Sequence, residues 1–148
     1  MNALLENKKI YLDYEIMETF EAGIELLGLE VKSLRAHHGS LIGSHITVRG
    51  GEAFLISADI PPYQEKNTPK DYESKRNRRL LLTSAEINKL ASLEAKKGLT
   101  IAPISMYNKG DKIKVEIAIV RGKKKYDKRE TLKKRDTERE LRREFRDR

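Results

Sequence analysis

A regular alternation of branched apolar and polar residues in the last third of the chain is the feature that most restricts its fold. The apolar positions fall two residues apart, at Ile113, Val115, Ile117 and Ile119. Successive side chains of a β-strand point to opposite faces, so this run predicts a strand with one buried face. An extended run at 99–107 precedes it, and the turn-forming residues 108–111 between the two runs predict a hairpin. Because Pro103 lacks an amide donor, we expect the first strand to be bulged or at a sheet edge there.

The body of the chain carries further strand patterns. Strands are predicted at 14–26, 44–48, 52–58 and 79–82. The Gly-Gly pair at 50–51 separates two of them and predicts a tight hairpin turn. Between 60 and 74, prolines, polar residues and mixed charges follow no period, so a long loop is expected there.

Helix signals are fewer than strand signals. Thr83 and Glu86 form a capping box, in which each side chain satisfies an unpaired amide of the helix start. Gly98 supplies a left-handed stop after a basic last turn. A shorter helix is expected over 28–35. Strands with regular turns and two or three flanking helices predict a mainly β fold, a small closed or partly open barrel.

Positive charge is concentrated at the C-terminal end. The 148 residues include 31 Lys and Arg against 23 Asp and Glu, a net charge of +8, and +7 of it lies in residues 121–148. This segment has few apolar anchors, so it cannot offset the entropy cost of ordering. It also lacks Pro, lacks Gly after Gly122, and is rich in helix-forming residues. We therefore divide the chain into a body, 1–121, and a basic tail, 122–148, that is disordered until an anionic surface makes it helical.

Composition excludes several classes of protein. The absence of Cys excludes a disulfide scaffold, a thiolate zinc site and a cysteine nucleophile. No apolar run approaches the roughly 20 residues of a membrane helix, and the first residues lack the layout of a signal peptide. The sequence therefore predicts a cytoplasmic protein that does not enter a membrane.

Catalytic and metal-binding patterns are weak. The acidic residues are Glu15, Glu18, Glu21, Glu25 and Glu30. Such a stretch can bind Mg²⁺, but alternation on a strand places Glu15 and Glu21 on one face and Glu18 on the other, which favours solvent-facing acids. The adjacent His37 and His38 diverge, and we interpret them and His45 as exposed loop residues. No phosphate-binding loop or nucleophile elbow is present. We expect no enzyme activity, no cofactor and no metal.

Basic clusters point to nucleic acid. Lys32 and Arg35 form one cluster, and residues 75–79 form a second cluster dominated by Arg, whose planar fork suits phosphate. A third cluster at 121–129 contains Tyr126, an aromatic ring that can stack on a base. Together with a barrel-like body, the clusters predict a nucleic-acid-binding module.

Several blocks of the sequence resemble the SsrA-binding protein (SmpB) family, the bacterial partner of transfer-messenger RNA. The blocks follow one another in family-like register, at 18–24 (ETFEAGI), 28–35 (GLEVKSLR), 51–55 (GEAFL), 78–82 (RRLLL) and 122–129 (GKKKYDKR). The resemblance implies a barrel of the oligonucleotide/oligosaccharide-binding (OB) type with flanking helices. It also implies an RNA-binding factor that carries the tRNA-like domain of transfer-messenger RNA to stalled ribosomes for trans-translation. The factor would act as a monomer on the RNA, its tail probing the empty mRNA channel beside the rRNA of the decoding centre.

The resemblance also assigns residues. Positions matching the family's RNA-binding surface are Asn7, Glu21 and Leu81, with Tyr14 or Tyr11 replacing a His that the family has where this chain has Leu12. Glu21 either hydrogen-bonds a base or holds a basic neighbour, and Leu81 either contacts RNA or packs in the core. The cations expected on the same surface are Lys32, Arg35, Arg76, Arg78 and Arg79. In the tail, the residues expected to contact the ribosome are Gly122, Lys123, Lys124, Tyr126, Asp127, Lys128 and Arg129.

This chain departs from the family at His37, His38 and Ser40, where the family has Gly, Lys and Asn. A histidine in place of that lysine makes a phosphate contact dependent on pH. Two alternatives to a rescue factor stay open, a general single-strand-binding or ribosomal protein and a carboxylate-metal nuclease.

Overall fold

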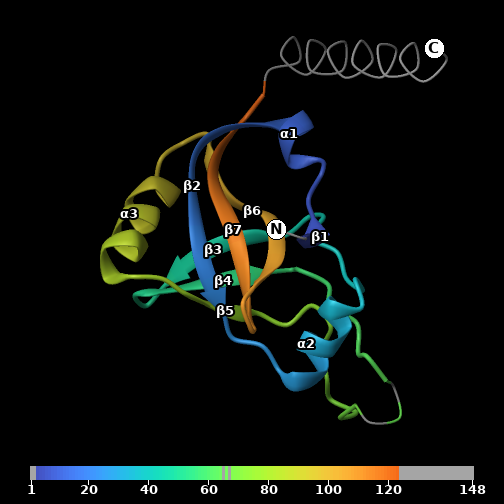
Figure 1. The fold of residues 1–148 in the computed structure, drawn as a ribbon. Coiled ribbons are helices and arrows are strands. Elements are labelled where there is room, and N and C mark those ends of the chain that lie inside the picture. Colours follow the sequence, from blue (N-terminus) through green and yellow to red (C-terminus); the bar gives the residue numbers. More distant parts are fainter. Residues whose placement is uncertain (1–2, 65, 67, 124–148) are drawn as a thin grey trace, which may run out of the picture.

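The computed structural model describes residues 3–64, 66 and 68–123. Ten elements follow one another along the chain (Figure 1): β1 (Ala3–Glu6), α1 (Ile10–Asp13), β2 (Tyr14–Ile24), α2 (Gly28–Arg35), β3 (His45–Arg49), β4 (Glu52–Ile56), β5 (Arg78–Leu81), α3 (Ser84–Glu94), β6 (Leu99–Lys109) and β7 (Lys112–Gly122). The predicted mainly β class is confirmed. The predicted strands, the two hairpins and the helices at 28–35 and after Thr83 are all present. Sequence patterns missed β1 and α1, which span only four residues each.

All seven strands form one antiparallel sheet in the order β1-β6-β7-β2-β5-β4-β3. The sheet curls so that the short strands β3, β4 and β5 cross the long strands β2, β6 and β7 (Figure 1). The barrel is not closed by a backbone ladder between β3 and β6, which lie close together with α3 beside both. The Glu94 carboxylate at the end of α3 instead accepts hydrogen bonds from the Val48 amide at 2.9 Å and the Thr47 hydroxyl at 2.7 Å. A helix side chain therefore covers an otherwise open strand edge.

One turn and one cap have the geometry that their residues predict. Gly50 and Gly51 adopt φ of 59° and 76°, and positive φ at both central positions is what a tight hairpin turn of this hand requires. The Thr83 hydroxyl oxygen accepts a hydrogen bond from the Glu86 amide, and the Glu86 carboxylate accepts one from the Thr83 amide. The capping box therefore fixes the start of α3.

Bulges modify two of the long strands, β6 and β2. The β6–β7 register shifts between Pro103 and Ser105, which confirms the predicted bulge, and β1 pairs with β6 only at 105–107, so Pro103 also lies at a local edge of the sheet. A second shift lies between Ile16 and Glu18 in β2. It moves Glu15 to the same face as Glu18 and leaves Glu21 on the opposite face. The prediction that Glu15 and Glu21 share a face is therefore wrong, because an extra residue in a strand reverses the alternation beyond it.

Each face of the long strands packs against its own apolar cluster. The inner face, which includes Val115, Ile117 and Ile119, contributes to the main core of the barrel. The outer face carries a smaller cluster of Ile10, Ala102, Ile104, Ala118 and Val120. Ile10 comes from α1, so this short helix covers one end of the outer face and leaves the other end for polar side chains. Within the described residues, no helix is long and apolar enough to cross a membrane.

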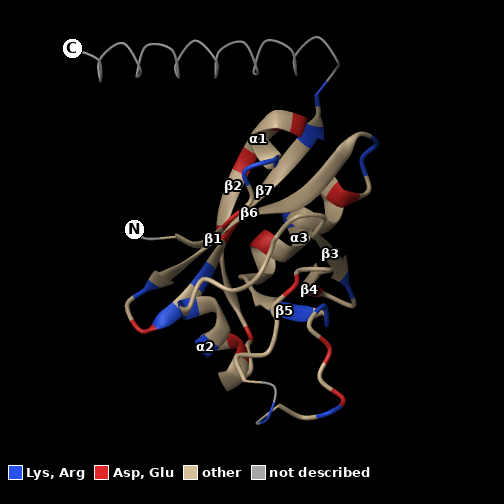
Figure 2. Ribbon diagram, turned by 90° about the vertical axis from the view of Figure 1, so that its right-hand side faces the viewer, with Lys and Arg blue, Asp and Glu red and all other residues tan. Residues whose placement is uncertain are grey.

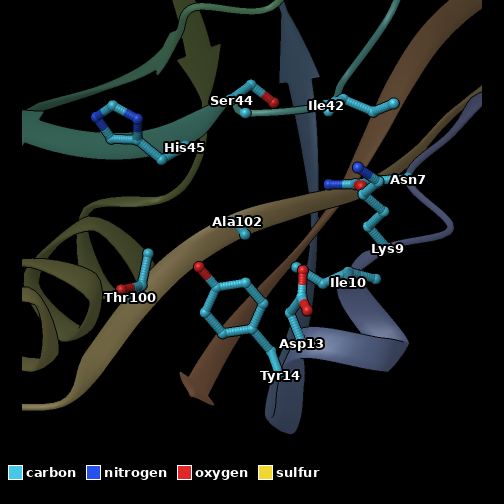
Figure 3. A pocket seen from close by; sticks show the side chains of 11 residues that line it. Asn7, Lys9, Ile10, Asp13, Tyr14, Ile42, Ser44, His45, Thr100 and Ala102 are labelled. Carbon is cyan, nitrogen blue, oxygen red and sulfur yellow. The ribbon is translucent and has the colours of Figure 1, made fainter. Parts of the chain in front are cut away.

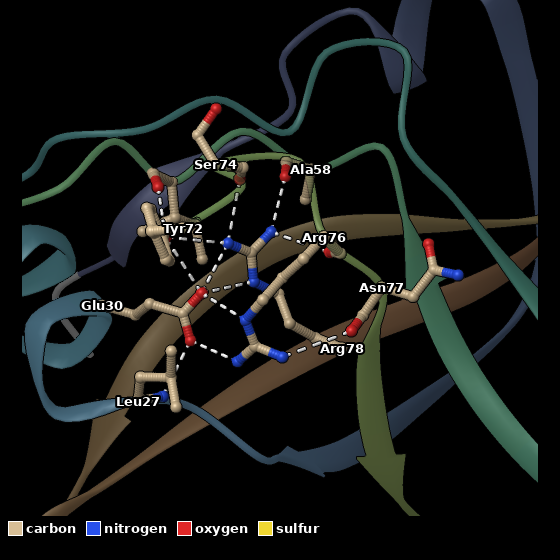
Figure 4. Close-up of polar contacts among 9 residues, drawn as sticks. Leu27, Glu30, Ala58, Tyr72, Ser74, Arg76, Asn77 and Arg78 are labelled. Carbon is tan, nitrogen blue, oxygen red and sulfur yellow. Dashed lines mark hydrogen bonds and ion pairs between the residues drawn. The ribbon is translucent and has the colours of Figure 1, made fainter. Parts of the chain in front are cut away.

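A buried ion pair joins α2 to the start of β5, at the end of the long β4–β5 connection (Figure 4). Glu30 and Arg78 are both fully buried, and the Arg78 Nη2 lies 2.6 Å from Glu30 Oε2. Arg78 also donates to the carbonyls of Ala58 at 2.7 Å and Ser74 at 2.9 Å. Arg76 and the Tyr72 hydroxyl complete the shell around the Glu30 carboxylate. The connection predicted as a loop at 60–74 is thereby fastened to the helix at several points.

The pKa of Glu30 lies below its ordinary value. Burial alone would raise this pKa, but hydrogen bonds from Arg76, the Leu27 amide and Arg78 outweigh it. A carboxyl whose folded-state pKa is depressed contributes stability above its unfolded pKa, and loses that contribution as the pH falls through the folded value.

We predict that Glu30→Gln lowers the free energy of unfolding at pH 7 by about 3–5 kcal/mol, because it leaves the buried Arg78 charge unpaired. Urea unfolding followed by circular dichroism measures the change. The difference from the parent should shrink as the pH falls from the ordinary pKa of glutamate, about 4.3, through the lower folded-state pKa of Glu30, because the parent's Glu30 then becomes protonated. Glu25→Gln is the matched control: Glu25 pairs with Arg79 at the surface, and its loss should cost less than about 1 kcal/mol. Equal losses in the two variants would contradict the assigned role of the buried pair.

Candidate RNA-binding surface

The polar end of the outer face is built by register across three strands. In the β-ladders Glu21 lies opposite Glu116, Gly23 opposite Lys114, and Tyr107 opposite Lys114. Directly opposed residues share a face of the sheet, so these side chains stand together. Lys112 and Lys109, at the β6–β7 turn, extend the same face. We call the set Glu21, Tyr107, Lys109, Lys112 and Lys114 the outer-face cluster, and the acidic Glu116 lies beside it, opposite Glu21.

Glu21 lies within the outer-face cluster and contacts two donors. The Tyr107 hydroxyl donates to Glu21 Oε2 at 2.5 Å, and the Lys109 ammonium lies 2.8 Å from Oε1. The hydrogen bonds from Lys109 and then Tyr107 lower the pKa of Glu21, whereas burial and the Glu21 charge raise the pKa of Tyr107. Of the two alternatives for Glu21, the geometry favours the one in which it holds a basic neighbour in place.

Leu81 adjoins the outer-face cluster through Gly23. The two residues are partners in the β2–β5 ladder, and a Cβ on Gly23 would lie 3.1 Å from that of Leu81. Leu81 nevertheless remains 48% exposed. The core-packing alternative for Leu81 is therefore wrong, and its side chain presents an apolar surface beside the charged cluster.

The arginines expected at the surface differ in accessibility. The prediction that Arg78 lies on the RNA-binding surface is wrong. Arg78 is fully buried and donates hydrogen bonds to Glu30 and to backbone carbonyls, so RNA cannot reach it in this structure. The Arg76 side chain is 30% exposed and also pairs with Glu30. Arg79 is exposed and pairs with Glu25 and Glu52 at the surface. Sequence clustering alone could not separate a buried pair member from its exposed neighbours.

The cations of α2 lie close to the β6–β7 turn. Lys32 and Arg35 are both exposed, and Arg35 Nη2 donates to the Asp111 carbonyl at 3.0 Å. Asp111 lies between Lys109 and Lys112, so α2 brings its positive charge to one end of the outer-face cluster. Figure 2 shows this gathering of Lys and Arg around α2 and the neighbouring turn.

Asn7 and Tyr14 lie at the other end of the outer face, around a cavity of about 400 Å³ (Figure 3). Asn7 is only 6% exposed, and its amide nitrogen donates to the Pro103 carbonyl at 3.1 Å. The Asn7 carbonyl accepts from the Ile10 amide at 3.2 Å, so Asn7 also positions the start of α1. The Asn7 Oδ1 is buried without a hydrogen-bond partner.

The basic tail is attached to α1 at its root. Gly122 pairs with Tyr14 at the end of the β2–β7 ladder. Beyond it, the Lys123 amide donates to the Asp13 carbonyl at 2.9 Å, and the Lys123 ammonium donates to the Tyr11 carbonyl at 2.7 Å. The other tail residues expected to contact the ribosome lie outside the described residues: Lys124, Tyr126, Asp127, Lys128 and Arg129.

The acidic residues of the N-terminal half pair with cations from other elements. Their partners are Arg121 for Glu15, Lys89 for Glu18, Lys109 for Glu21, Arg79 for Glu25, and Arg76 and Arg78 for Glu30. Among residues 3–64, 66 and 68–123, no three His, Asp or Glu side chains gather as a metal site would require. His37 and His38 are exposed in a loop as predicted, whereas the exposed His45 begins β3.

Sequence reasoning missed four members of the outer-face cluster. Lys112 and Lys114 lie at polar positions of the alternating run, Lys109 in the predicted turn 108–111, and Tyr107 at the end of the extended run 99–107. The alternation itself held the signal, because it places every second residue on one face. What the alternation could not supply was the register that brings Glu21 to that face.

The described residues form a small, partly open antiparallel β-barrel with flanking helices, and one sheet face of it combines a cationic cluster with an exposed leucine. The family model described as "SmpB protein" matches residues 4–147, and the chain belongs to that family. It is similar to the SsrA-binding protein of Lactobacillus delbrueckii subsp. bulgaricus, with 48% identity over 98% of this chain and 94% of the relative. It is also similar to the SsrA-binding protein of Chlorobaculum tepidum, with 49% identity over 93% of this chain and 87% of the relative.

A solved structure has the same fold. Its description reads "tmRNA-SmpB: a journey to the center of the bacterial ribosome", and the match has a TM-score of 0.68 and 38% sequence identity. It covers 86% of this chain and 92% of that chain.

We predict that Lys123→Met loosens the root of the tail. The substitution removes the Lys123–Tyr11 hydrogen bond, which is worth about 1 kcal/mol, and amide exchange at Lys123 should become about fivefold faster. Hydrogen exchange followed by NMR measures this rate. Lys123→Arg keeps a donor and should exchange as the parent does, and Lys97→Met controls for loss of an exposed charge. An unchanged rate in Lys123→Met would show that the side chain does not hold the root.

Proposed function

We propose that this protein binds the tRNA-like domain of transfer-messenger RNA and delivers it to stalled ribosomes for trans-translation. The observation that carries the proposal is membership of the SmpB family over nearly the whole chain, combined with the similarity to a chain from a tmRNA-SmpB ribosome structure. The protein acts as an RNA-binding factor without a reaction of its own, and its place of action is the cytoplasm, where ribosomes translate. Its partners are transfer-messenger RNA and the ribosome.

The outer face is the RNA-binding surface in this proposal. Lys109 and Lys114 supply positive charge for phosphate groups, and Glu21 orients Lys109 and Tyr107 toward the RNA. Leu81 gives an apolar contact beside them, and Lys32 and Arg35 extend the cationic surface onto α2. Arg76 and Arg79 lie at its margin. Asn7 and Tyr14 complete the surface at the end covered by α1.

The tail has a separate partner in this proposal. A basic segment with few apolar anchors needs a polyanion to become ordered, and the empty mRNA channel beside the rRNA of the decoding centre is such an environment. Gly122, Lys123 and the motif that follows them contact the ribosome after the RNA has been delivered. The hydrogen bonds of Lys123 to α1 set where the tail leaves the body. One molecule of protein acts on each RNA.

We predict that Lys109→Met and Lys114→Met each weaken binding of transfer-messenger RNA. Each removed phosphate contact should reduce the slope of log affinity against log salt concentration by about 0.7–0.9, because fewer counterions are released. Filter binding between 50 and 300 mM KCl measures affinity and slope. Lys97→Met, in the exposed turn between α3 and β6, is the matched control and should keep both values. If the control and the two variants behave alike, the outer face is not the RNA-binding surface.

A chain ending at Lys123 tests the division of labour between body and tail. We predict that it keeps its affinity for transfer-messenger RNA within about threefold, because it retains the whole outer face and loses few of the phosphate contacts. The same chain should fail to support tagging of stalled peptides in a reconstituted translation reaction. Loss of RNA binding on truncation would contradict the assignment of separate partners.

A further inference from the structure

The tip of the β6–β7 hairpin extends past the strands on either side of it. Within the described residues, the ladder with β1 reaches Tyr107 of β6, and the ladder with β2 reaches Lys114 of β7. Residues 109–112 form the tip: they lie beyond both ladders, are all exposed, and have only one another as strand partners. A two-stranded ribbon without a third strand or a core is marginally stable in water. The tip therefore needs a contact from outside the sheet.

Charge within the tip opposes its closure. Lys109 and Lys112 lie directly opposite each other in the β6–β7 ladder. Like charges at opposed positions destabilise a pair of strands. The Glu21 carboxylate, 2.8 Å from the Lys109 ammonium, offsets this repulsion on one of the two strands. The tip thus carries two cations of the outer-face cluster, and its own ladder and charges do not fix their position.

Arg35 supplies the contact from outside the sheet. It is the last residue of α2, and its Nη2 donates to the Asp111 carbonyl at 3.0 Å, across 76 residues of sequence. The helix that carries it is anchored in the core: Glu30 belongs to the buried pair with Arg78, and Leu34, next to Arg35, is fully buried. A hydrogen bond to a backbone carbonyl restrains the chain itself. The helix α2 therefore gives the tip a fixed point of attachment.

We propose that Arg35 is a positioning residue for RNA binding, which holds the tip through the Asp111 carbonyl so that Lys109 and Lys112 are in place before RNA arrives. The inference rests on the proposed function, and it gives Arg35 a role beyond the charge that it adds to the surface. RNA then meets cations that are already positioned, so less free energy is lost in ordering them on binding. Lys32 is an exposed cation of the same helix, and among the described residues it makes no hydrogen bond or ion pair with the tip.

The first measurement uses the full chain without RNA. NMR order parameters of the backbone amides at 109–112 should be about 0.85 in the parent and fall to about 0.6 in Arg35→Met, as in a flexible segment. Arg35→Lys keeps a donor on a long side chain and should keep the values of the parent. Lys32→Met is the matched control, because it removes a cation from the same helix and should leave the tip unchanged. Urea unfolding should give every variant the midpoint of the parent, since both side chains are exposed.

The second measurement is a double-mutant cycle on the binding of transfer-messenger RNA. The loss caused by Lys109→Met should be about threefold smaller in the Arg35→Met background than in the parent, because a loose tip no longer holds Lys109 against the RNA. In the same cycle with Lys32→Met, the two losses should multiply. Arg35→Lys should restore the response of the parent to Lys109→Met.

Unchanged order parameters in Arg35→Met would overturn the inference, because the hydrogen bond would then not hold the tip. Losses that multiply in the Arg35 cycle as they do in the Lys32 cycle would also overturn it, because Arg35 would then act through its charge alone. Binding of transfer-messenger RNA by the parent is measured first and tests the proposed function by itself. Since the order parameters are measured without RNA, a failure of the proposed function is distinguished from a failure of the Arg35 contact.

Discussion

The buried Glu30–Arg78 pair is the interaction on which the positions of α2, the β4–β5 connection and the start of β5 depend. Two charges in a dry interior are tolerated only when each is paired and hydrogen-bonded. Arg78 meets this condition through carbonyls of the β4–β5 connection, and Glu30 meets it from α2. The pair therefore fixes the helix, the long connection and the start of β5 relative to one another. Lys32 and Arg35 are on the same helix, so the ion pair that holds α2 also holds them beside the β6–β7 turn.

Local sequence patterns were sufficient for most of the elements. The alternation at 113–119, the Gly-Gly turn at 50–51 and the capping box of Thr83 each report a conformation that nearby residues decide. The short β1 and α1 leave no comparable pattern, because four residues cover only two periods of a strand and little more than one turn of a helix. They are held by distant partners instead, as when the Asn7 amide donates to the Ile104 carbonyl.

The candidate site was predictable in a different way. Resemblance to a family supplied Glu21 and Leu81, whose residue types alone do not indicate RNA. The cluster around Glu21 needed the register of three strands, including the bulge in β2 that a period of two cannot reveal. For Arg78 the sequence predicted too much. It lies in a run of arginines and was expected at the surface, because the sequence does not show that Glu30 is its buried partner.

Pairing also explains how a body of nearly neutral charge can attract a polyanion. Acids such as Glu15 and Glu18 carry negative charge that neighbouring cations on the same surface already neutralise. Glu21 is neutralised by Lys109, and the charges of Lys112 and Lys114 exceed that of the remaining acid on the same face, Glu116. An approaching phosphate responds to this local field within about 10 Å and not to the sum over the chain. The strand register, and not the number of charges, therefore decides where positive charge gathers on the body.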